Sequence, residues 1–334
     1  MTNVASLGKA LEQRFRCVRV PPARHVPSLE EDARNGLLSQ PRSLPPKYFY
    51  DDHGSELFER ICKTSEYYPT RTEDFLLQQH AQDIIRSTQP GKIFELGSGS
   101  STKTQHLLDA CNEIAHFPSY TAFDISERAL LFGWETLSSR YDWLEIDLFL
   151  GDYEAGFKNI PRQNGSRLVV FLGSTIGNFE QDRAIGFMND LRANMSNSDR
   201  LLVGFDRVKD EHILNAAYND KDGITAAFNL NVLNVLNNEL GANFDPDKFK
   251  HSANYDADKA QVEMHLVSAC THRVTFNTLA TSIEIDAGES ICTEISRKFT
   301  TKSSAHLLGQ AGFAIEQDFI SADGYFSLVL AYPV

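Results

Sequence analysis

Cysteine is scarce in this 334-residue sequence, and its few copies follow no pattern. The five cysteines are Cys17, Cys62, Cys111, Cys270 and Cys292, and no two of them form a CxxC pair. Disulfide frameworks and structural zinc sites both depend on paired or regularly spaced cysteines. The arrangement therefore argues against both, and it predicts reduced thiols in a cytoplasmic protein without a metal site.

Long apolar runs and an excess of basic residues are also missing. No apolar run approaches the roughly 20 residues that a membrane helix needs, and residues 1–26 contain no apolar stretch of the kind found in secretory signals. The sequence has 32 Lys and Arg residues against 45 Asp and Glu residues, a formal net charge of -13. Nucleic-acid binding gains most of its affinity from neutralised phosphates, so an acidic chain is a poor candidate for it. We expect a monomer with a small-molecule partner, no nucleic acid and no membrane.

The sequence does contain a regular alternation of apolar and helical segments, which begins near residue 92. Short apolar runs that alternate with helical periodicity are typical of βαβ units in a doubly wound parallel sheet. The expected strands are 92–97, 120–126, 144–153, 167–174 and 200–206, and the expected helices are 102–114, 128–141 and 181–195.

The rhythm changes in the second part of the chain. A mixed α/β segment interrupts the parallel sheet, and two C-terminal strands joined by a turn at 322–324 complete it. The fold class is therefore α/β, with a second region of mixed composition. The expected helices here are 209–220, 224–244 and 304–313, and the expected strands lie within 261–276, 281–300 and 314–334.

The stretch "FELGSGSSTKT", residues 94–104, follows the first expected strand and opens a helix. Gly97 and Gly99 would let the backbone turn tightly and approach a ligand closely. A plain tight turn is the alternative. A dinucleotide site needs a third glycine in the pattern GxGxxG, and Thr102 occupies that position. The loop therefore argues against a nicotinamide oxidoreductase.

Acidic residues mark the ends of three successive strands. Glu95 precedes the glycines and suits a ligand with a cationic amino-acid head. Asp124 could accept both hydroxyls of a ribose, and Asp152 could accept a hydrogen bond from an adenine amino group. Each acid alone could be a solvated loop residue, but the ordered set fits S-adenosylmethionine (SAM) better than NAD. This arrangement resembles the class I SAM-dependent methyltransferases, which implies a Rossmann-like sheet of seven strands that ends in a hairpin.

The stretch "FLGSTIGNF", residues 171–179, follows the fourth expected strand. Gly173 allows close approach of a ligand. Asn178 offers one carbonyl acceptor and two N–H donors, which could hold both the α-amino and the α-carboxylate group of an amino acid. The alternative is an asparagine that caps the next helix.

Five stretches together resemble one narrower family. They are "PKYFYDDHGSELFERI", "SEYYPTRTE", "ELGSGSSTKT", "FLGSTIGNF" and "TEISRKF". They are similar to the L-histidine Nα-methyltransferases of ergothioneine biosynthesis, and the resemblance runs from about residue 46 to the C-terminus. It implies SAM-dependent Nα-trimethylation of L-histidine to hercynine. It also implies two domains, a SAM-binding domain of residues 72–206 plus 299–334 and a substrate-binding domain of residues 1–71 plus 207–298.

The resemblance implies roles for individual residues. Tyr50 and Tyr218 match tyrosines that bind the carboxylate of the amino acid, and Asn178 matches the asparagine that positions the amine, with no dedicated base. Glu294 and Ser296 match the pair that binds the imidazole nitrogens. The other pocket residues implied are Phe58, Tyr67 and Met264, and the cofactor residues implied are Gly97, Lys103, Asp124 and Asp152.

The chemistry of the Glu294 and Ser296 pair agrees with an imidazole ligand. Residues i and i+2 of a strand point to the same face, so a carboxylate and a hydroxyl there could accept from one ring nitrogen and donate to the other. A solvated strand face is the alternative. A relative that methylates a tryptophan derivative needs no such pair, because an indole offers only an N–H donor. A catalytically silent nucleotide-binding module is a further alternative, which the full set of acceptor residues disfavours.

Overall fold

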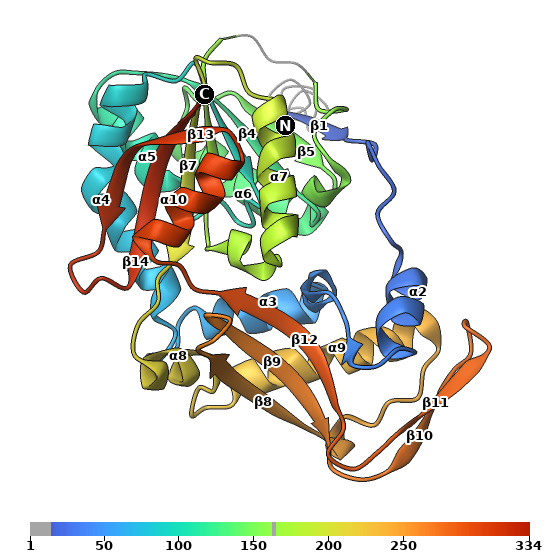
Figure 1. The fold of residues 1–334 in the computed structure, drawn as a ribbon. Helices are drawn as coiled ribbons and strands as arrows, with labels where there is room; N and C mark the ends of the chain where they lie inside the picture. The colour runs from blue at the N-terminus through green and yellow to red at the C-terminus, as the bar shows by residue number, and fades with distance from the viewer. Residues whose placement is uncertain (1–14, 162–164) are drawn as a thin grey trace, which may run out of the picture.

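The computed structural model describes residues 15–161 and 165–334, and its larger body is a sheet of eight strands within those ranges (Figure 1). The strand order is β1-β5-β4-β3-β6-β7-β14-β13. Neighbours from β1 to β7 pair in parallel, whereas β14 pairs antiparallel with both β7 and β13. The strands are β1 Phe15–Arg19, β3 Lys92–Leu96, β4 Ser119–Asp124, β5 Ile146–Leu150, β6 Arg167–Phe171, β7 Arg200–Asp206, β13 Phe313–Ile320 and β14 Phe326–Pro333.

Helices cover both faces of this sheet. Side chains of neighbouring residues in β3, Ile93 and Phe94, enter different hydrophobic clusters, so the central strand is apolar on both faces. Helices α4 to α6 contribute to the first cluster, and α7 and α10 contribute to the second. The helices are α4 Tyr68–Thr88, α5 Gln105–Glu113, α6 Glu127–Arg140, α7 Gln181–Ala193 and α10 Thr301–Gln310.

The smaller body contains a four-stranded sheet in the order β2-β12-β9-β8. Its apolar side packs against α9, where Phe228 and Val232 share a cluster with Val262 and Leu266 of β9. A hairpin, β10 with β11, projects away from this sheet in Figure 1. The elements are α2 Leu29–Asp32, β2 Arg42–Ser43, α3 Asp52–Ile61, α8 Glu211–Tyr218, α9 Ile224–Leu240, β8 Phe249–Asp256, β9 Gln261–Ser268, β10 His272–Phe276, β11 Thr281–Ile285 and β12 Ser290–Arg297.

Five short helical turns connect these elements within the described residues. They are η1 Ala33–Leu37, η2 Pro46–Phe49, η3 Tyr153–Ala155, η4 Thr175–Asn178 and η5 Pro246–Lys248.

The α/β alternation expected from the sequence is confirmed, and so is the C-terminal pair of strands. The expected count of seven strands misses β1, which adds to the edge of the large sheet beside β5. The expected domain limits stay a proposal. Strand β1 lies in the large sheet although the resemblance assigns residues 1–71 to the second domain, and the limit at residue 72 falls inside α4.

The two bodies meet where η4 lies against β12. Gly177 of η4 is so close to this strand that a Cβ on it would lie 2.8 Å from the backbone oxygen of Arg297. Backbone cannot move away as the tip of a side chain can, so only glycine fits without displacing one of the two segments. The next residue, Asn178, is thereby held at the junction.

We predict that Gly177→Ala destabilises the protein by about 1–3 kcal/mol, because the added methyl group overlaps the β12 backbone. The control is Gly186→Ala in α7, where no heavy atom lies within 4 Å of the added Cβ among the described residues. Alanine there should be neutral or slightly stabilising. Urea unfolding of both variants checks the prediction, and equal stability of the two would contradict it.

Candidate active site

The glycine-rich loop after β3 is fastened to the end of β4. Gly97 and Gly99 have φ values of +66° and +51°, in the left-handed region that glycine adopts most easily. The Gly97 N–H donates to the Phe123 carbonyl, and the Gly99 N–H donates to the Asp124 carboxylate, each at 2.8 Å. The structure therefore brings together Gly97, Gly99 and Asp124, which are all expected to bind the cofactor.

The loop also leaves hydrogen-bonding capacity unused. The buried Ser98 hydroxyl has no hydrogen-bond partner among the described residues. Asp124 accepts the Gly99 and Ser126 N–H groups on different oxygens, so each oxygen keeps a lone pair. Burial raises the pKa of Asp124. A ligand with hydroxyl groups would satisfy these atoms.

Glu95 lies buried beneath the loop. It accepts hydrogen bonds from the hydroxyls of Thr104, at 2.5 Å, and of Tyr120. Burial raises the pKa of Glu95 to about 7, although both hydroxyls act in the opposite direction. The structure thus gives Glu95 protein partners, and its expected contact with the cationic end of the cofactor stays a prediction.

Lys103 is joined to the acceptor loop through a residue that the sequence analysis left without a role. Its ammonium pairs with the fully buried Glu73 of α4. The Glu73 carboxylate also accepts the Gly173 N–H, at 2.8 and 3.0 Å from its two oxygens. Glu73 therefore connects the cofactor loop to Gly173, whose φ of +75° explains the glycine there.

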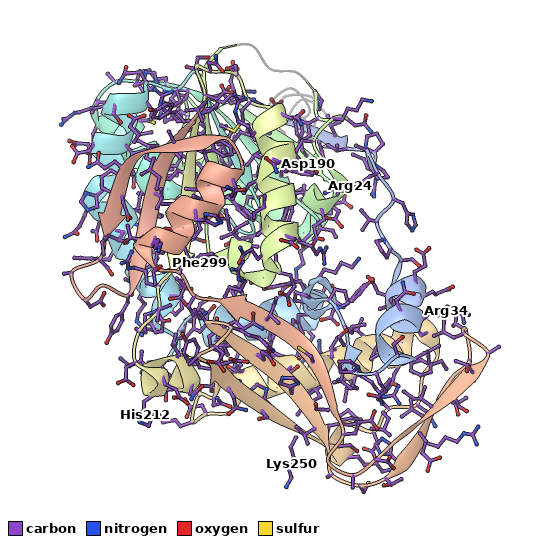
Figure 2. All side chains as sticks on the ribbon, viewed as in Figure 1. Arg24, Arg34, Asp190, His212, Lys250 and Phe299 are labelled. Carbon is purple, nitrogen blue, oxygen red and sulfur yellow. The ribbon has the colours of Figure 1, made fainter. Side chains whose placement is uncertain are left out.

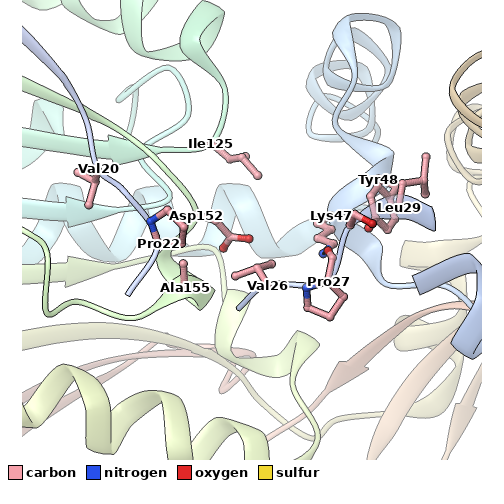
Figure 3. A pocket seen from close by; sticks show the side chains of 11 residues that line it. Val20, Pro22, Val26, Pro27, Leu29, Lys47, Tyr48, Ile125, Asp152 and Ala155 are labelled. Atoms are coloured by element: carbon pink, nitrogen blue, oxygen red, sulfur yellow. The ribbon is translucent and has the colours of Figure 1, made fainter. Parts of the chain in front are cut away.

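Asp152 faces a hollow of about 380 Å³ at the end of β5 (Figure 3). One oxygen of Asp152 accepts the Glu154 N–H at 2.7 Å. Ile125, which directly follows Asp124, also lines the hollow. The N-terminal segment 20–29, together with Lys47 and Tyr48, supplies most of the remaining wall.

The N-terminal segment is fixed to the large sheet before it crosses to the smaller body. The Val20 N–H donates to the Leu150 carbonyl at 2.9 Å. Arg24 lies beside Asp190 of α7 and forms an ion pair with it (Figure 2). The sequence offered no motif for this segment, so its place at the hollow was not predicted.

Four aromatic residues expected in the substrate pocket form a continuous chain. The ring centroids of Tyr50 and Phe58 lie 5.6 Å apart, those of Phe58 and Tyr67 lie 6.3 Å apart, and those of Tyr67 and Tyr218 lie 6.2 Å apart. Phe228 of α9 contacts both Tyr50 and Phe58, and sequence reasoning missed it. The two tyrosines of "SEYYPTRTE" therefore differ, because Tyr67 belongs to this row of aromatic rings and Tyr68 does not.

The other end of the chain reaches β12. Asn178 donates its side-chain N–H to Glu294 at 3.0 Å, and no side chain caps α7, so the helix-capping alternative for Asn178 is wrong. Met264 of β9 is the register partner of Glu294, which places the two on the same face of the sheet. Burial raises the pKa of Glu294 to about 7, with Lys298 and the Asn178 amide acting in the opposite direction.

Ser296 lies two residues beyond Glu294 and is 6% exposed. Its Oγ accepts a hydrogen bond from the Tyr218 hydroxyl at 2.7 Å and another from the Lys298 ammonium at 2.7 Å. Lys298 also donates to the Tyr218 hydroxyl at 2.8 Å. Tyr218 thus bonds to Ser296, which is expected to bind the imidazole, and its expected contact with a carboxylate stays a prediction.

Asp206, at the end of β7, is the anion that neutralises this region. Its carboxylate pairs with Lys298 at 2.8 Å and with Lys209 at 2.5 Å, and it accepts the Tyr68 hydroxyl at 2.8 and 2.9 Å. Burial favours the neutral acid, but the two lysines outweigh it and lower the pKa of Asp206. Burial lowers the pKa of Lys209 to about 8, despite the neighbouring carboxylate.

Comparison with known proteins assigns the family. Residues 29–333 match the family described as histidine-specific, SAM-dependent methyltransferases. The chain belongs to this family. It is a SAM-dependent methyltransferase with the α/β fold that the sequence predicted.

Curated relatives cover nearly the whole methyltransferase. It is 40% identical to the histidine N-alpha-methyltransferase of Mycolicibacterium smegmatis. The 304 aligned residues cover 91% of this chain and 94% of that protein. The Mycobacterium tuberculosis protein of the same name is 39% identical over 320 residues, 94% of this chain and 99% of that one. The 4-dimethylallyltryptophan N-methyltransferase of Claviceps purpurea is 32% identical over 208 residues, 59% of this chain and 60% of that protein.

The residues at the ends of β3, β4 and β5 fit the SAM that the methyltransferase uses. The loop at Gly97, the free lone pairs of Asp124 and the hollow at Asp152 succeed one another along three adjacent strands. Within residues 15–161 and 165–334, no cluster of His, Cys, Asp and Glu could hold a metal ion. In those same ranges, no helix is both long and apolar enough to cross a bilayer.

The raised pKa of Glu294 predicts a pH-dependent stability in the ligand-free methyltransferase. Between the usual value of 4.5 and about 7, the folded state keeps a proton that the unfolded state releases. The free energy of unfolding should therefore fall by roughly 2–3 kcal/mol, through this group, as the pH rises across that window.

The control is Glu294→Gln, which keeps an acceptor for Asn178 but does not titrate. Urea unfolding between pH 5 and pH 8 gives the difference between the two proteins, and that difference should favour the wild type more at pH 5. A difference that stays constant over this range would contradict the assignment.

Proposed function

We propose that this methyltransferase transfers three methyl groups from SAM to the α-amino nitrogen of L-histidine and releases hercynine, the first step of ergothioneine biosynthesis. The observation that carries the proposal is the pairing of Glu294 with Ser296 at the junction of the two bodies. Glu294 offers an acceptor and Ser296 a hydroxyl, and Glu294 is bonded to the Asn178 amide. The mycobacterial relatives named for histidine support the same substrate.

The imidazole would lie against β12, between Glu294 and Ser296 and beside Met264. This placement directs the rest of the amino acid toward η4, where the Asn178 amide and the Tyr50 hydroxyl could hold the amine and the carboxylate. Asn178 bonds to Glu294, so one contact connects the ring-binding group to the amine-binding group.

The main task of the protein is positioning. SAM supplies an activated methyl group on a sulfonium, so the chain has to hold an unprotonated amine in line with the methyl–sulfur bond. Orientation of two reactants can lower a barrier by several kcal/mol. An α-amine has a pKa near 8, and a small downward shift leaves enough free amine at neutral pH without a dedicated base.

Repeated transfer requires a site that tolerates each added methyl group. The trimethylated product has a fixed positive charge and no N–H donor. The contacts with the ring and the carboxylate do not change as methyl groups are added, so they would hold every intermediate in the same orientation. The aromatic chain offers ring faces that a methylated cation can approach.

The finer features of the prediction remain proposals. They are the two-domain division, the individual ligand contacts, a monomeric state, cytoplasmic location and the absence of a nucleic-acid partner. The net charge of -13 supports the last of these.

Mass spectrometry of one reaction tests the function. The purified protein is incubated with SAM and an equimolar pool of amino acids, with tryptophan and 4-dimethylallyltryptophan included. We expect a gain of three methyl groups on histidine alone. Methylation of a tryptophan derivative instead would establish the alternative that the Claviceps relative represents. Binding of SAM without methylation of any amino acid would support a silent module.

A further inference from the structure

Lys298 uses every hydrogen of its ammonium group in buried contacts. An ammonium has three N–H donors and no acceptor. One donor faces Asp206 at 2.8 Å, one the Tyr218 hydroxyl at 2.8 Å and one Ser296 Oγ at 2.7 Å. The residue is 3% exposed, so water does not compete for these positions. The three contacts therefore fix the orientation of the group.

This arrangement leaves Ser296 with one free hydrogen-bonding function. A serine hydroxyl has two lone pairs and one proton. The lone pairs accept from Lys298 and from Tyr218, both at 2.7 Å. Only the O–H proton remains, and the cation of Lys298 repels it toward the opposite side of the oxygen. Ser296 can donate a hydrogen bond to a ligand but cannot accept one.

We propose that Lys298 is a positioning residue that fixes Ser296 as a hydrogen-bond donor, so that the pocket selects a ring with an unprotonated nitrogen at Ser296 and an N–H at Glu294. This inference rests on the proposed function, because it takes the imidazole of histidine as the ring. It adds to that function the residue that fixes the polarity of the pair.

Glu294 supplies the opposite polarity. Its Oε1 already accepts the Asn178 N–H at 3.0 Å, and a carboxylate has further lone pairs for a ring N–H. A neutral imidazole has one acceptor and one donor nitrogen, and it satisfies both residues. An imidazolium presents a second N–H to Ser296, where no acceptor exists. An indole or pyrrole ring presents no acceptor, so the Ser296 proton stays buried without a partner, which is costly.

Lys209 shows what a purely structural lysine in this region would do. It neutralises the other oxygen of Asp206, at 2.5 Å, and also bonds to the Tyr68 hydroxyl and the Arg207 carbonyl. Among the described residues, the hydrogen bonds and ion pairs of Lys209 reach neither Ser296 nor Tyr218. Replacement of either lysine removes one cation from the same carboxylate, so the two variants are matched in the charge that they remove and differ in their effect on Ser296.

The test measures binding, and so does not depend on turnover. Histidine and the two pyrrolylalanines, pyrrol-2-yl and pyrrol-3-yl, are titrated by calorimetry into the protein with saturating S-adenosylhomocysteine. Each pyrrole keeps one ring N–H and replaces the other nitrogen by C–H. The readout is the dissociation constant of the tighter pyrrolylalanine divided by that of histidine, for wild type, Lys298→Met and Lys209→Met.

We expect wild type to favour histidine by about 100-fold or more, because a site built for a hydrogen bond strongly rejects a ligand that lacks it. In Lys298→Met this ratio should fall at least tenfold, mainly through weaker binding of histidine. In Lys209→Met it should stay within about twofold of wild type. The kcat for histidine at saturation should change less than KM in Lys298→Met.

An unchanged ratio in Lys298→Met, or an equal fall in both variants, would overturn the inference. If Lys298→Met does not fold, Lys298→Gln keeps an N–H donor toward Asp206 but carries no ammonium charge, and it should show the same fall. Methylation of histidine by a wild type with no preference over pyrrolylalanine would overturn this inference while the proposed function stands. Failure of wild type to bind histidine would overturn both.

Discussion

The buried carboxylate of Asp206 is the interaction on which the rest of the site depends. It ends the central strand β7, and it pairs with Lys298 just beyond β12 and with Lys209 on the segment after β7. Its own backbone carbonyl accepts the Phe299 N–H at 2.8 Å, at the point where Figure 2 shows Phe299 between the two bodies. One residue thus joins the large sheet to the small one. Replacement of Asp206 would leave two buried lysines without an anion.

The residues that join the two bodies also determine the hydrogen bonding at the site. Two lysines exceed the charge of one carboxylate, and the surplus faces the phenol and hydroxyl groups of Tyr218 and Ser296. Glu294 lies on the same strand and carries a raised pKa of about 7 because of burial. A donor and an acceptor are therefore set side by side on β12, and the Asn178 amide links the acceptor to η4.

A similar connection serves the cofactor side. Glu73 is fully buried in α4 and bonds both to Lys103 of the cofactor loop and to the Gly173 N–H of the acceptor loop. Both connecting acids, Glu73 and Asp206, are buried and paired with lysines of the protein. The loops at Lys103 and Gly173 are therefore joined by a buried ionic contact, which is costlier to break than a surface pair.

Periodicity and motifs predicted most strands of the large sheet from the sequence. Continuous apolar runs revealed the central strands because a parallel sheet buries both faces, and β12 was recognised from its alternation. Strand β1 was missed because an edge strand in the N-terminal segment has no glycine loop after it. Strand β8, "FKHSANYD", was missed because one polar face hides its short apolar alternation.

At the site, the sequence motifs predicted the residues expected to contact a ligand. They did not predict the residues that hold those side chains in place. Asn178 bonds to Glu294, and Ser296 lies two residues further along the same strand. Lys298 and Glu73 lie within the stretches "TEISRKF" and "SEYYPTRTE". From the sequence alone, however, a charged residue in a motif is expected to be solvent-exposed, so their buried contacts were not predicted. Ile125 and the segment 20–29 contain no recognisable motif, because the wall of a hollow depends on the shape of its side chains rather than on particular chemical groups.

The protonation state of bound histidine tests the central claim most directly. Histidine labelled with ¹⁵N in the ring is bound to the protein with S-adenosylhomocysteine at pH 6, where most free imidazole is protonated. The ¹⁵N chemical shifts then report each ring nitrogen separately. The account predicts one nitrogen with a proton and one without, in a single tautomer. Two protonated nitrogens in the bound ring would contradict it, because Ser296 would then have to accept a hydrogen bond that its contacts with Lys298 and Tyr218 exclude.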